Sequence, residues 1–179
     1  MQRILDTLKK RLQTAPIMEI QRTLGFIQKC SFSFYKPANQ EEIAKFVIET
    51  GFTLPSGYLD FLQIHNGALL FQDESGKGNP SWIIFGLDDV TDYHEQYHLT
   101  EKMYPIAKYD QTLICVDNQA VIDGREDYLF DRSIYDSPEN EGENMHLNFE
   151  LYLDRLIVSQ GDHFWFWNTL NAHNFKSEQ

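Results

Sequence analysis

Apolar residues recur at helical spacing in several parts of the chain. Residues three and four apart share one face of an α-helix, so this spacing predicts amphipathic helices. The predicted helices cover residues 1–13, 40–50, 55–65, 87–98 and 149–157. The last of them has the clearest pattern, with apolar residues at i, i+3, i+4, i+7 and i+8, whereas the fourth is polar on most sides.

Capping and turn-forming residues mark the ends of these helices. Asn39 is a suitable N-cap for the second predicted helix, and Gly51 follows it, where a left-handed residue is favoured. Pro55 suits the first position of the next helix, because the N–H that it lacks would be unsatisfied there anyway. Asn66 and Gly67 end that helix, and we expect this pair to supply positive φ.

Short apolar segments between the helices predict strands. They are residues 68–71, 82–85, 106–107, 113–117, 120–122 and 128–130. Residues 72–80 are expected to form an exposed hairpin loop, and 133–143 a flexible acidic loop. For residues 18–29, a short helix and a helix leading into a strand both remain possible. Residues 164–167 are apolar at odd and even positions alike, so we expect this segment to pack under another element. This order of elements predicts an α+β fold with a mostly antiparallel sheet.

Length and composition predict a single domain. The chain has 179 residues, of which 42% are hydrophobic. A chain of this size can bury roughly 70% of its unfolded surface in one core. No stretch approaches the ~18 consecutive apolar residues of a membrane span. Residues 1–13 lack the apolar region and cleavage site of a signal peptide, so we expect a cytoplasmic protein without a membrane contact.

The charge is large, negative and unevenly distributed. The net charge is −12, which argues against a nucleic-acid partner, because phosphate binding needs clustered Lys and Arg. Residues 1–36 hold seven basic and two acidic residues, which leaves eight basic and 25 acidic residues, or −17, in the remainder. An ordinary solvated face and a surface that attracts a basic partner both fit this pattern.

One short motif suggests metal chemistry. His94-Glu95-Gln96-Tyr97-His98 matches HExxH, which on a helix places two imidazoles on one face, ready to bind zinc, with a glutamate to activate water. The surroundings argue against this interpretation. Acidic side chains surround the segment, and Glu101 and Tyr104 occupy the glycine and histidine positions of the extended pattern.

Other catalytic and cofactor signals are weaker. The chain has no GxSxG, Walker or GxGxxG motif. Cys30 and Cys115 belong to no CxxC pair, and we expect both to be free, buried thiols. Asp117 and Asp123 are more typical of hydrogen-bond acceptors in turns than of an acid/base pair, and His65 is more typical of a core or capping residue than of a ligand. We therefore expect no cofactor, no metal and no enzymatic activity.

The segment at residues 41–71 resembles the SUKH superfamily, in its Smi/Knr-type branch. The residues that carry the resemblance are Glu42, Gly51, Leu54, Pro55, Tyr58, Leu62, Asn66 and Gly67. Weaker matches follow in the same order at 105–107, 114–117 and 149–153, so that the resemblance covers about residues 40–158. Ala68 stands where a second glycine is common. Residues 1–36 have no clear counterpart, and we expect them to form an N-terminal helical extension.

The resemblance implies a curved antiparallel sheet flanked by helices, with no catalytic constellation. Many bacterial members look like immunity proteins that bind and neutralise a toxin, often a nuclease. We therefore expect a cognate protein toxin, basic in character, as the partner, and a monomer or weak homodimer. Acidity and expected exposure place the contact on Trp82, Asp88, Asp89, Asp92, Asp123, Glu126 and Asp127. Two alternatives remain: a regulatory scaffold without a toxin partner, as the eukaryotic members imply, and a zinc hydrolase built on His94, Glu95 and His98.

Overall fold

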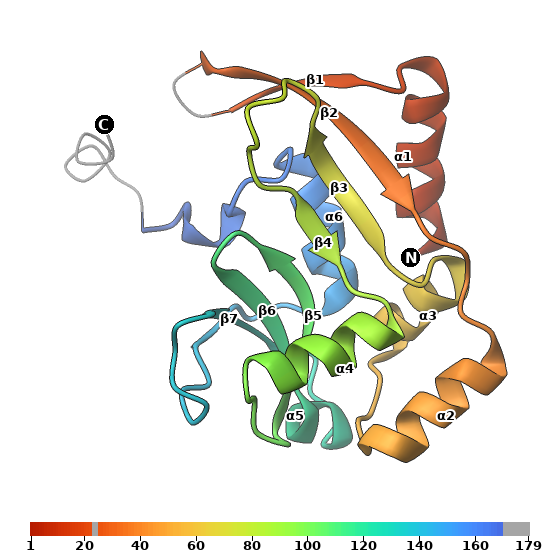
Figure 1. Cartoon of the computed structure of the whole chain (residues 1–179), viewed down its shortest axis with the longest axis vertical. Coiled ribbons are helices and arrows are strands. Elements are labelled where there is room, and N and C mark those ends of the chain that lie inside the picture. The colour runs from red at the N-terminus through yellow and green to blue at the C-terminus, as the bar shows by residue number, and fades with distance from the viewer. Residues whose placement is uncertain (23–24, 170–179) are drawn as a thin grey trace.

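A computed structural model describes residues 1–22 and 25–169 of the chain. In these residues, α-helices surround one antiparallel sheet (Figure 1). The helices are α1 (Gln2–Thr14), α2 (Gln40–Thr50), α3 (Ser56–Ile64), α4 (Leu87–Gln96), α5 (Asn118–Ile122) and α6 (Phe149–Val158). The strands are β1 (Met18–Gln21), β2 (Ile27–Phe34), β3 (Ala68–Asp73), β4 (Trp82–Ile84), β5 (Met103–Tyr109), β6 (Thr112–Asp117), β7 (Leu129–Ser133) and β8 (Glu143–Asn144). A 3₁₀ helix follows at Phe164–Phe166.

The sheet has the simplest order that an antiparallel sheet can have. Within the described residues its eight strands lie side by side in sequence order, each antiparallel to the next, and the sheet does not close. The pairing register shifts between Ser31 and Ser33 in β2, and between Pro105 and Ala107 in β5. Such irregularities bend a strand and increase its twist. The α+β prediction with an antiparallel sheet is confirmed.

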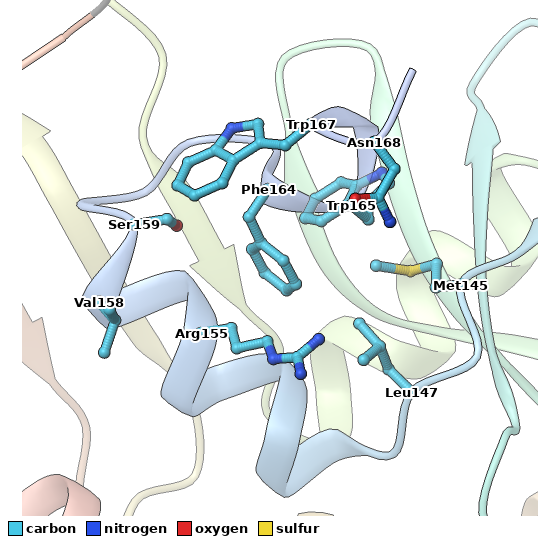
Figure 2. Close-up of a pocket in the computed structure, with 9 residues that line it drawn as sticks. All are labelled: Met145, Leu147, Arg155, Val158, Ser159, Phe164, Trp165, Trp167 and Asn168. Atoms are coloured by element: carbon cyan, nitrogen blue, oxygen red, sulfur yellow. The ribbon is translucent and has the colours of Figure 1, made fainter. Parts of the chain in front are cut away.

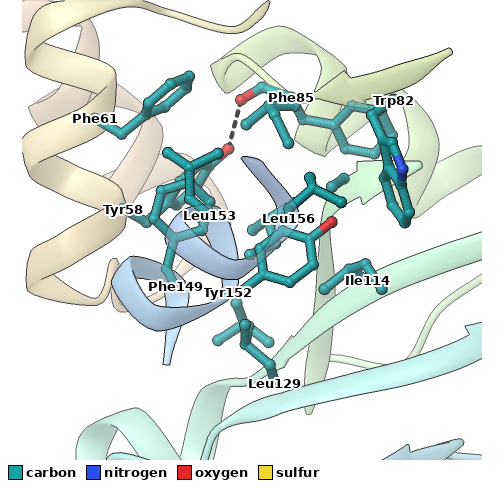
Figure 3. Close-up of a cluster of buried hydrophobic side chains, with 14 of the residues drawn as sticks. Tyr58, Phe61, Trp82, Phe85, Ile114, Leu129, Phe149, Tyr152, Leu153 and Leu156 are labelled. Carbon is teal, nitrogen blue, oxygen red and sulfur yellow. Dashed lines mark hydrogen bonds between the residues drawn. The ribbon is translucent and has the colours of Figure 1, made fainter. Parts of the chain in front are cut away.

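The core lies between the sheet and the helices α3 and α6 (Figure 3). Tyr58 of α3 and Phe149 of α6 bring their ring centroids to 5.0 Å, and Tyr152 of α6 meets Trp82 of β4 at 6.1 Å. The buried Tyr58 hydroxyl donates a 2.7 Å hydrogen bond to the carbonyl of Phe85. Each fully buried apolar side chain of this kind contributes about 1.5–3 kcal/mol, so this layer fixes the position of both helices on the sheet.

Local sequence signals set the predicted helix ends. The Asn39 side chain accepts from the Glu42 N–H at 2.9 Å, and the Glu42 carboxylate accepts from the Asn39 N–H at 2.8 Å. Gly51 ends α2 with φ of 72°. Asn148 caps α6 by accepting from the Leu151 N–H. An N-cap of this type stabilises a helix by about 1 kcal/mol.

The Asn-Gly turn after α3 works differently from the prediction. Gly67 has a φ of 103°, but Asn66 does not adopt positive φ. Its side-chain oxygen instead accepts from the Leu87 N–H at 2.8 Å, at the start of α4. Gly86 lies so close that an added Cβ would be 2.6 Å from the Asn66 carbonyl oxygen. The turn therefore fixes the position of α4. Pro55, expected inside α3, is its N-cap.

Two other expectations are wrong, and a third is met in part. Residues 18–29 contribute to strands β1 and β2, so that the N-terminal segment is helical only in α1 and otherwise extends the sheet. Residues 120–122 lie in α5, because the Asp117 side chain caps a helix there by accepting from the Ala120 N–H. The expectation for 164–167 holds only for Phe164 and Trp165, which pack against the core, whereas Phe166 and Trp167 are 40% and 51% exposed.

Candidate protein-binding surfaces

Helix α4 presents a stripe of carboxylates to solvent. Asp88, Asp92 and Glu95 are exposed and lie at i, i+4 and i+7, which places them on one face. None of the three side chains has a hydrogen bond or ion pair with another described residue. Like charges at this spacing destabilise a helix by about 0.2–0.5 kcal/mol per pair. Asp92 and Glu95 also lie away from the helix N-terminus, where the dipole would favour them. Helix stability therefore favours Asp88, in the first turn, but does not explain Asp92 and Glu95.

The opposite face of α4 attaches the helix to the core. Leu87 and Val90 are buried, and the Tyr93 ring stacks on Phe85 with centroids 4.5 Å apart. The Asp89 carboxylate accepts from the Gly86 N–H at 2.9 Å. Asp89, predicted as a partner contact, thus has a structural role as well. Because its inner face is fixed, α4 holds the carboxylate stripe on a rigid support.

The second predicted group of acids lies in the turn between α5 and β7. These side chains already have partners in the chain: Asp127 forms a double hydrogen bond with Arg125 at 3.0 and 3.1 Å, and Glu126 accepts from Asn148 at 2.9 Å. The Arg125 contact lowers the pKa of Asp127. Asp123 accepts from Gln119 at 2.8 Å. A partner would have to compete with these contacts, so this group is a weaker candidate than the α4 stripe.

Trp82 was predicted to contact a partner and does not reach the surface. It is 0% exposed, and its indole N–H donates to the Gly161 carbonyl at 2.9 Å. It lies within a cluster of rings from β5, α6 and the C-terminal segment, which includes Tyr109, Tyr152, His163 and Trp165. Trp82 is a core residue, and that prediction is wrong.

The HExxH segment does not form the predicted zinc geometry. Helix α4 ends at Gln96, and His98 follows in a left-handed conformation with φ of 50°. The His94 ring packs on Phe52, with centroids 5.1 Å apart, and its Nε2 lies 3.2 Å from the Thr100 carbonyl oxygen. The two imidazoles therefore do not share a helical face. Across residues 1–22 and 25–169, no group of three or more His, Cys, Asp or Glu side chains could hold a metal ion.

The remaining titratable residues also have structural surroundings. The Nδ1 atom of His65 lies 2.8 Å from the Tyr35 carbonyl oxygen, and partial burial lowers the pKa of this histidine. Cys30 and Cys115 are free and buried, as expected. Burial raises the pKa of the Cys115 thiol to about 12, which removes the thiolate needed by a nucleophile.

A concave surface that the sequence analysis missed lies beside the C-terminal segment. It is a cavity of about 380 Å³, walled by α6, the segment before it and the aromatic run at its end (Figure 2). Phe164 points into the space between Trp167 and Arg155, and Met145 and Leu147 form another wall. The aromatic run 164–167 was the feature of the sequence that could have indicated this cavity. Because its odd and even positions are all apolar, the sequence does not show which of these residues face the cavity.

Comparison with known proteins gives the family. The sequence model of the SMI1 / KNR4 family (SUKH-1) matches residues 37–155. The chain belongs to this family, and the earlier resemblance is confirmed. Members are generally non-enzymatic, immunity-type domains.

Two proteins of Bacillus subtilis (strain 168) are similar to the chain. Uncharacterized protein YobM is 30% identical over 143 residues, which is 77% of this chain and 75% of that protein. Uncharacterized protein YnaB is 26% identical over 139 residues, or 78% of this chain and 90% of that protein. In the described part of the chain, no helix has the length and apolar character to cross a membrane.

Proposed function

We propose that this chain is an immunity protein that neutralises a cognate toxin by binding it, and that the α4 stripe contacts a basic surface of the toxin. The observation that carries this proposal is the stripe itself. It consists of Asp88, Asp92 and Glu95, whose side chains are exposed and without partners among the described residues. Asp92 and Glu95 lie beyond the first turn, where the helix dipole does not favour a carboxylate, and the three like charges repel one another. Family membership supports an immunity-type role in general.

Charge complementarity explains how the α4 stripe favours binding to a basic toxin. A nuclease toxin has a basic substrate groove, and an acidic protein can occupy it. The chain has a net charge of −12, so a basic toxin is attracted before contact, which raises the association rate. Asp123, Glu126 and Asp127 belong to the proposal as a second contact, although their partners within the chain reduce their availability.

The alternative of a regulatory scaffold predicts no toxin partner. A toxin-like reading frame beside the gene favours the immunity proposal, and its absence favours the scaffold. The zinc hydrolase receives no support from the geometry, because His94 and His98 do not share a face.

A growth-protection assay tests the proposal. Proteins encoded beside the gene are expressed in a sensitive host, with and without this chain. Wild type is expected to restore growth, and the double variant Asp92→Lys/Glu95→Lys is expected to protect much less. Glu95 lies in the last turn of α4, where lysine suits the dipole, and Asp92 is exposed in the middle of the helix, so the variant should fold.

The matched control is Asp60→Lys/Glu139→Lys, which changes the net charge by the same +4 at two exposed carboxylates elsewhere. It should protect nearly as well as wild type. Equal protection by the two double variants would show that the α4 stripe is not the contact, and failure of wild type to protect against any neighbouring product would contradict the immunity role.

A further inference from the structure

A second concave surface runs across α1 and α6, apart from the α4 stripe. The aromatic cavity of Figure 2 forms one part of it. A second cavity of about 740 Å³ lies between α1 and α6, and Val158 lines both. Val158 is 73% exposed, so it forms an open apolar ridge between the two hollows. We call this continuous region the α1–α6 surface.

The cations of this surface have no acidic partner. Arg3 and Arg11 of α1 line the larger cavity, and Arg155 of α6 lines the aromatic one. None of the three guanidinium groups forms an ion pair or hydrogen bond with another residue that the structure describes. One carboxylate, Asp154, lines the larger cavity with the two arginines. The residues that line the two cavities therefore carry more positive than negative charge, on a chain whose net charge is −12. Two carboxylates lie beside the rings of the aromatic cavity, because the indole N–H groups of Trp165 and Trp167 donate to Asp131 and Asp162 at 2.7 and 3.0 Å.

The aromatic cavity has the composition of a site for a side chain. It is lined mainly by apolar groups, with Arg155, Ser159 and Asn168 as its polar residues. Pockets that bind specifically combine such an apolar lining with a few polar groups. A guanidinium matches a carboxylate through two parallel hydrogen bonds, and it also stacks on aromatic rings. Phe164, Trp165 and Trp167 supply those rings, and tryptophan and arginine dominate the energetics of protein interfaces.

The geometry points to the α1–α6 surface as a docking site for an acidic protein segment, with one bulky apolar residue in the aromatic cavity and flanking carboxylates on Arg155, Arg3 and Arg11. A polypeptide fits better than a membrane, because the aromatic side chains line a hollow and do not project into a bilayer. Most of the surface comes from residues before 37 and after 155, outside the range that the family model matches. The site is thus an addition to the shared domain, and its ligand is opposite in charge to the partner of the α4 stripe.

Synthetic peptides test this inference on the whole chain. The probe is a nine-residue peptide with phenylalanine at the centre and glutamate at the other positions. One control peptide has serine at the centre, and another has lysine in place of every glutamate. Binding is followed by titration calorimetry and by the indole N–H signals of Trp165 and Trp167 in NMR spectra.

The acidic phenylalanine peptide is expected to bind and to shift both indole signals, and the serine peptide to bind about tenfold more weakly. Arg155→Glu should weaken binding of the first peptide by about tenfold or more. Lys45→Glu is the matched control, because Lys45 is exposed on α2 and pairs only with Glu49 among the described residues, at 3.8 Å. It should leave binding unchanged.

Three results would overturn the inference. The first is that the acidic phenylalanine peptide does not bind at millimolar concentration. The second is that Arg155→Glu and Lys45→Glu change its affinity equally. The third is that the chain binds vesicles rich in anionic lipid but does not bind the peptide. The third result would show that the α1–α6 surface binds a membrane and not a polypeptide.

Discussion

Replacing Asn66 by alanine tests how the family's Asn-Gly turn positions the α4 stripe. The Asn66 side-chain oxygen accepts from the Leu87 N–H at 2.8 Å, in a partly buried site. Leu87 is the first residue of α4, and the N–H groups of a first helical turn have no acceptor within their own helix. Alanine leaves this N–H without its acceptor.

The loss of folding free energy in Asn66→Ala can be estimated from the loss measured when a helix cap is removed. Removing a side-chain acceptor at a helix start costs about 1–2 kcal/mol. For a domain of this size, 1 kcal/mol corresponds to roughly 2–4 °C in Tm. We therefore expect the Tm of Asn66→Ala to fall by about 2–8 °C. The amides of the first turn of α4 should also exchange faster with solvent.

The assay is urea and thermal unfolding of wild type, Asn66→Ala and Asn66→Asp. Aspartate retains an acceptor oxygen at the same place, and a negative charge suits the start of α4. It should keep most of the stability. If Asn66→Ala is as stable as wild type, or if Asn66→Asp loses as much stability as Asn66→Ala, then the hydrogen bond to Leu87 does not have the role described here.

Three further predictions concern the core. Tyr58→Phe removes the buried 2.7 Å hydrogen bond to the Phe85 carbonyl and should lower the free energy of unfolding by about 1–2 kcal/mol in urea; an unchanged value would contradict the role of this bond. Burial holds the pKa of His163 below its unfolded value of about 6.5. Protonation therefore favours the unfolded chain, and the stability that this residue contributes is full above pH 6.5 and falls as the pH drops towards the folded pKa. Thermal melts of wild type between pH 7.5 and 5.5 should show a loss of stability that is smaller in His163→Asn, and equal losses would refute this assignment. Because burial raises the pKa of Cys115 to about 12, a thiol reagent at pH 8 should modify this residue only after unfolding in urea, and rapid reaction in the native protein would be the contrary result.

The sequence correctly predicted those helices whose ends are set by hydrogen bonds between residues close together in the chain. The capping box at Asn39 and Glu42 and the cap at Asn148 act within a few residues, so helices α2 and α6 follow from the sequence. Residues 120–122 show the limit of this approach. Their apolar run suits a strand, but the Asp117 side chain caps a helix over the same residues.

The candidate site was harder to predict, because it depends on contacts between distant residues. Trp82 was expected to be exposed, but it is buried by rings that come from β5, α6 and the C-terminal segment. His94 and His98 have helical spacing in the sequence, but the helix ends between them. The exposure of Asp88 and Asp92 could be predicted from the polar face of α4, whereas the α1–α6 surface depends on how two ends of the chain meet.

The most direct test of the immunity proposal is a binding measurement with purified proteins. Each protein encoded beside the gene is titrated against wild type, Asp92→Lys/Glu95→Lys and Asp60→Lys/Glu139→Lys. We predict that one basic neighbour binds wild type and the Asp60→Lys/Glu139→Lys control with similar affinity, binds Asp92→Lys/Glu95→Lys at least about tenfold more weakly, and loses affinity as salt rises. Absence of binding by every neighbour, or equal affinity for the two double variants, would contradict the account.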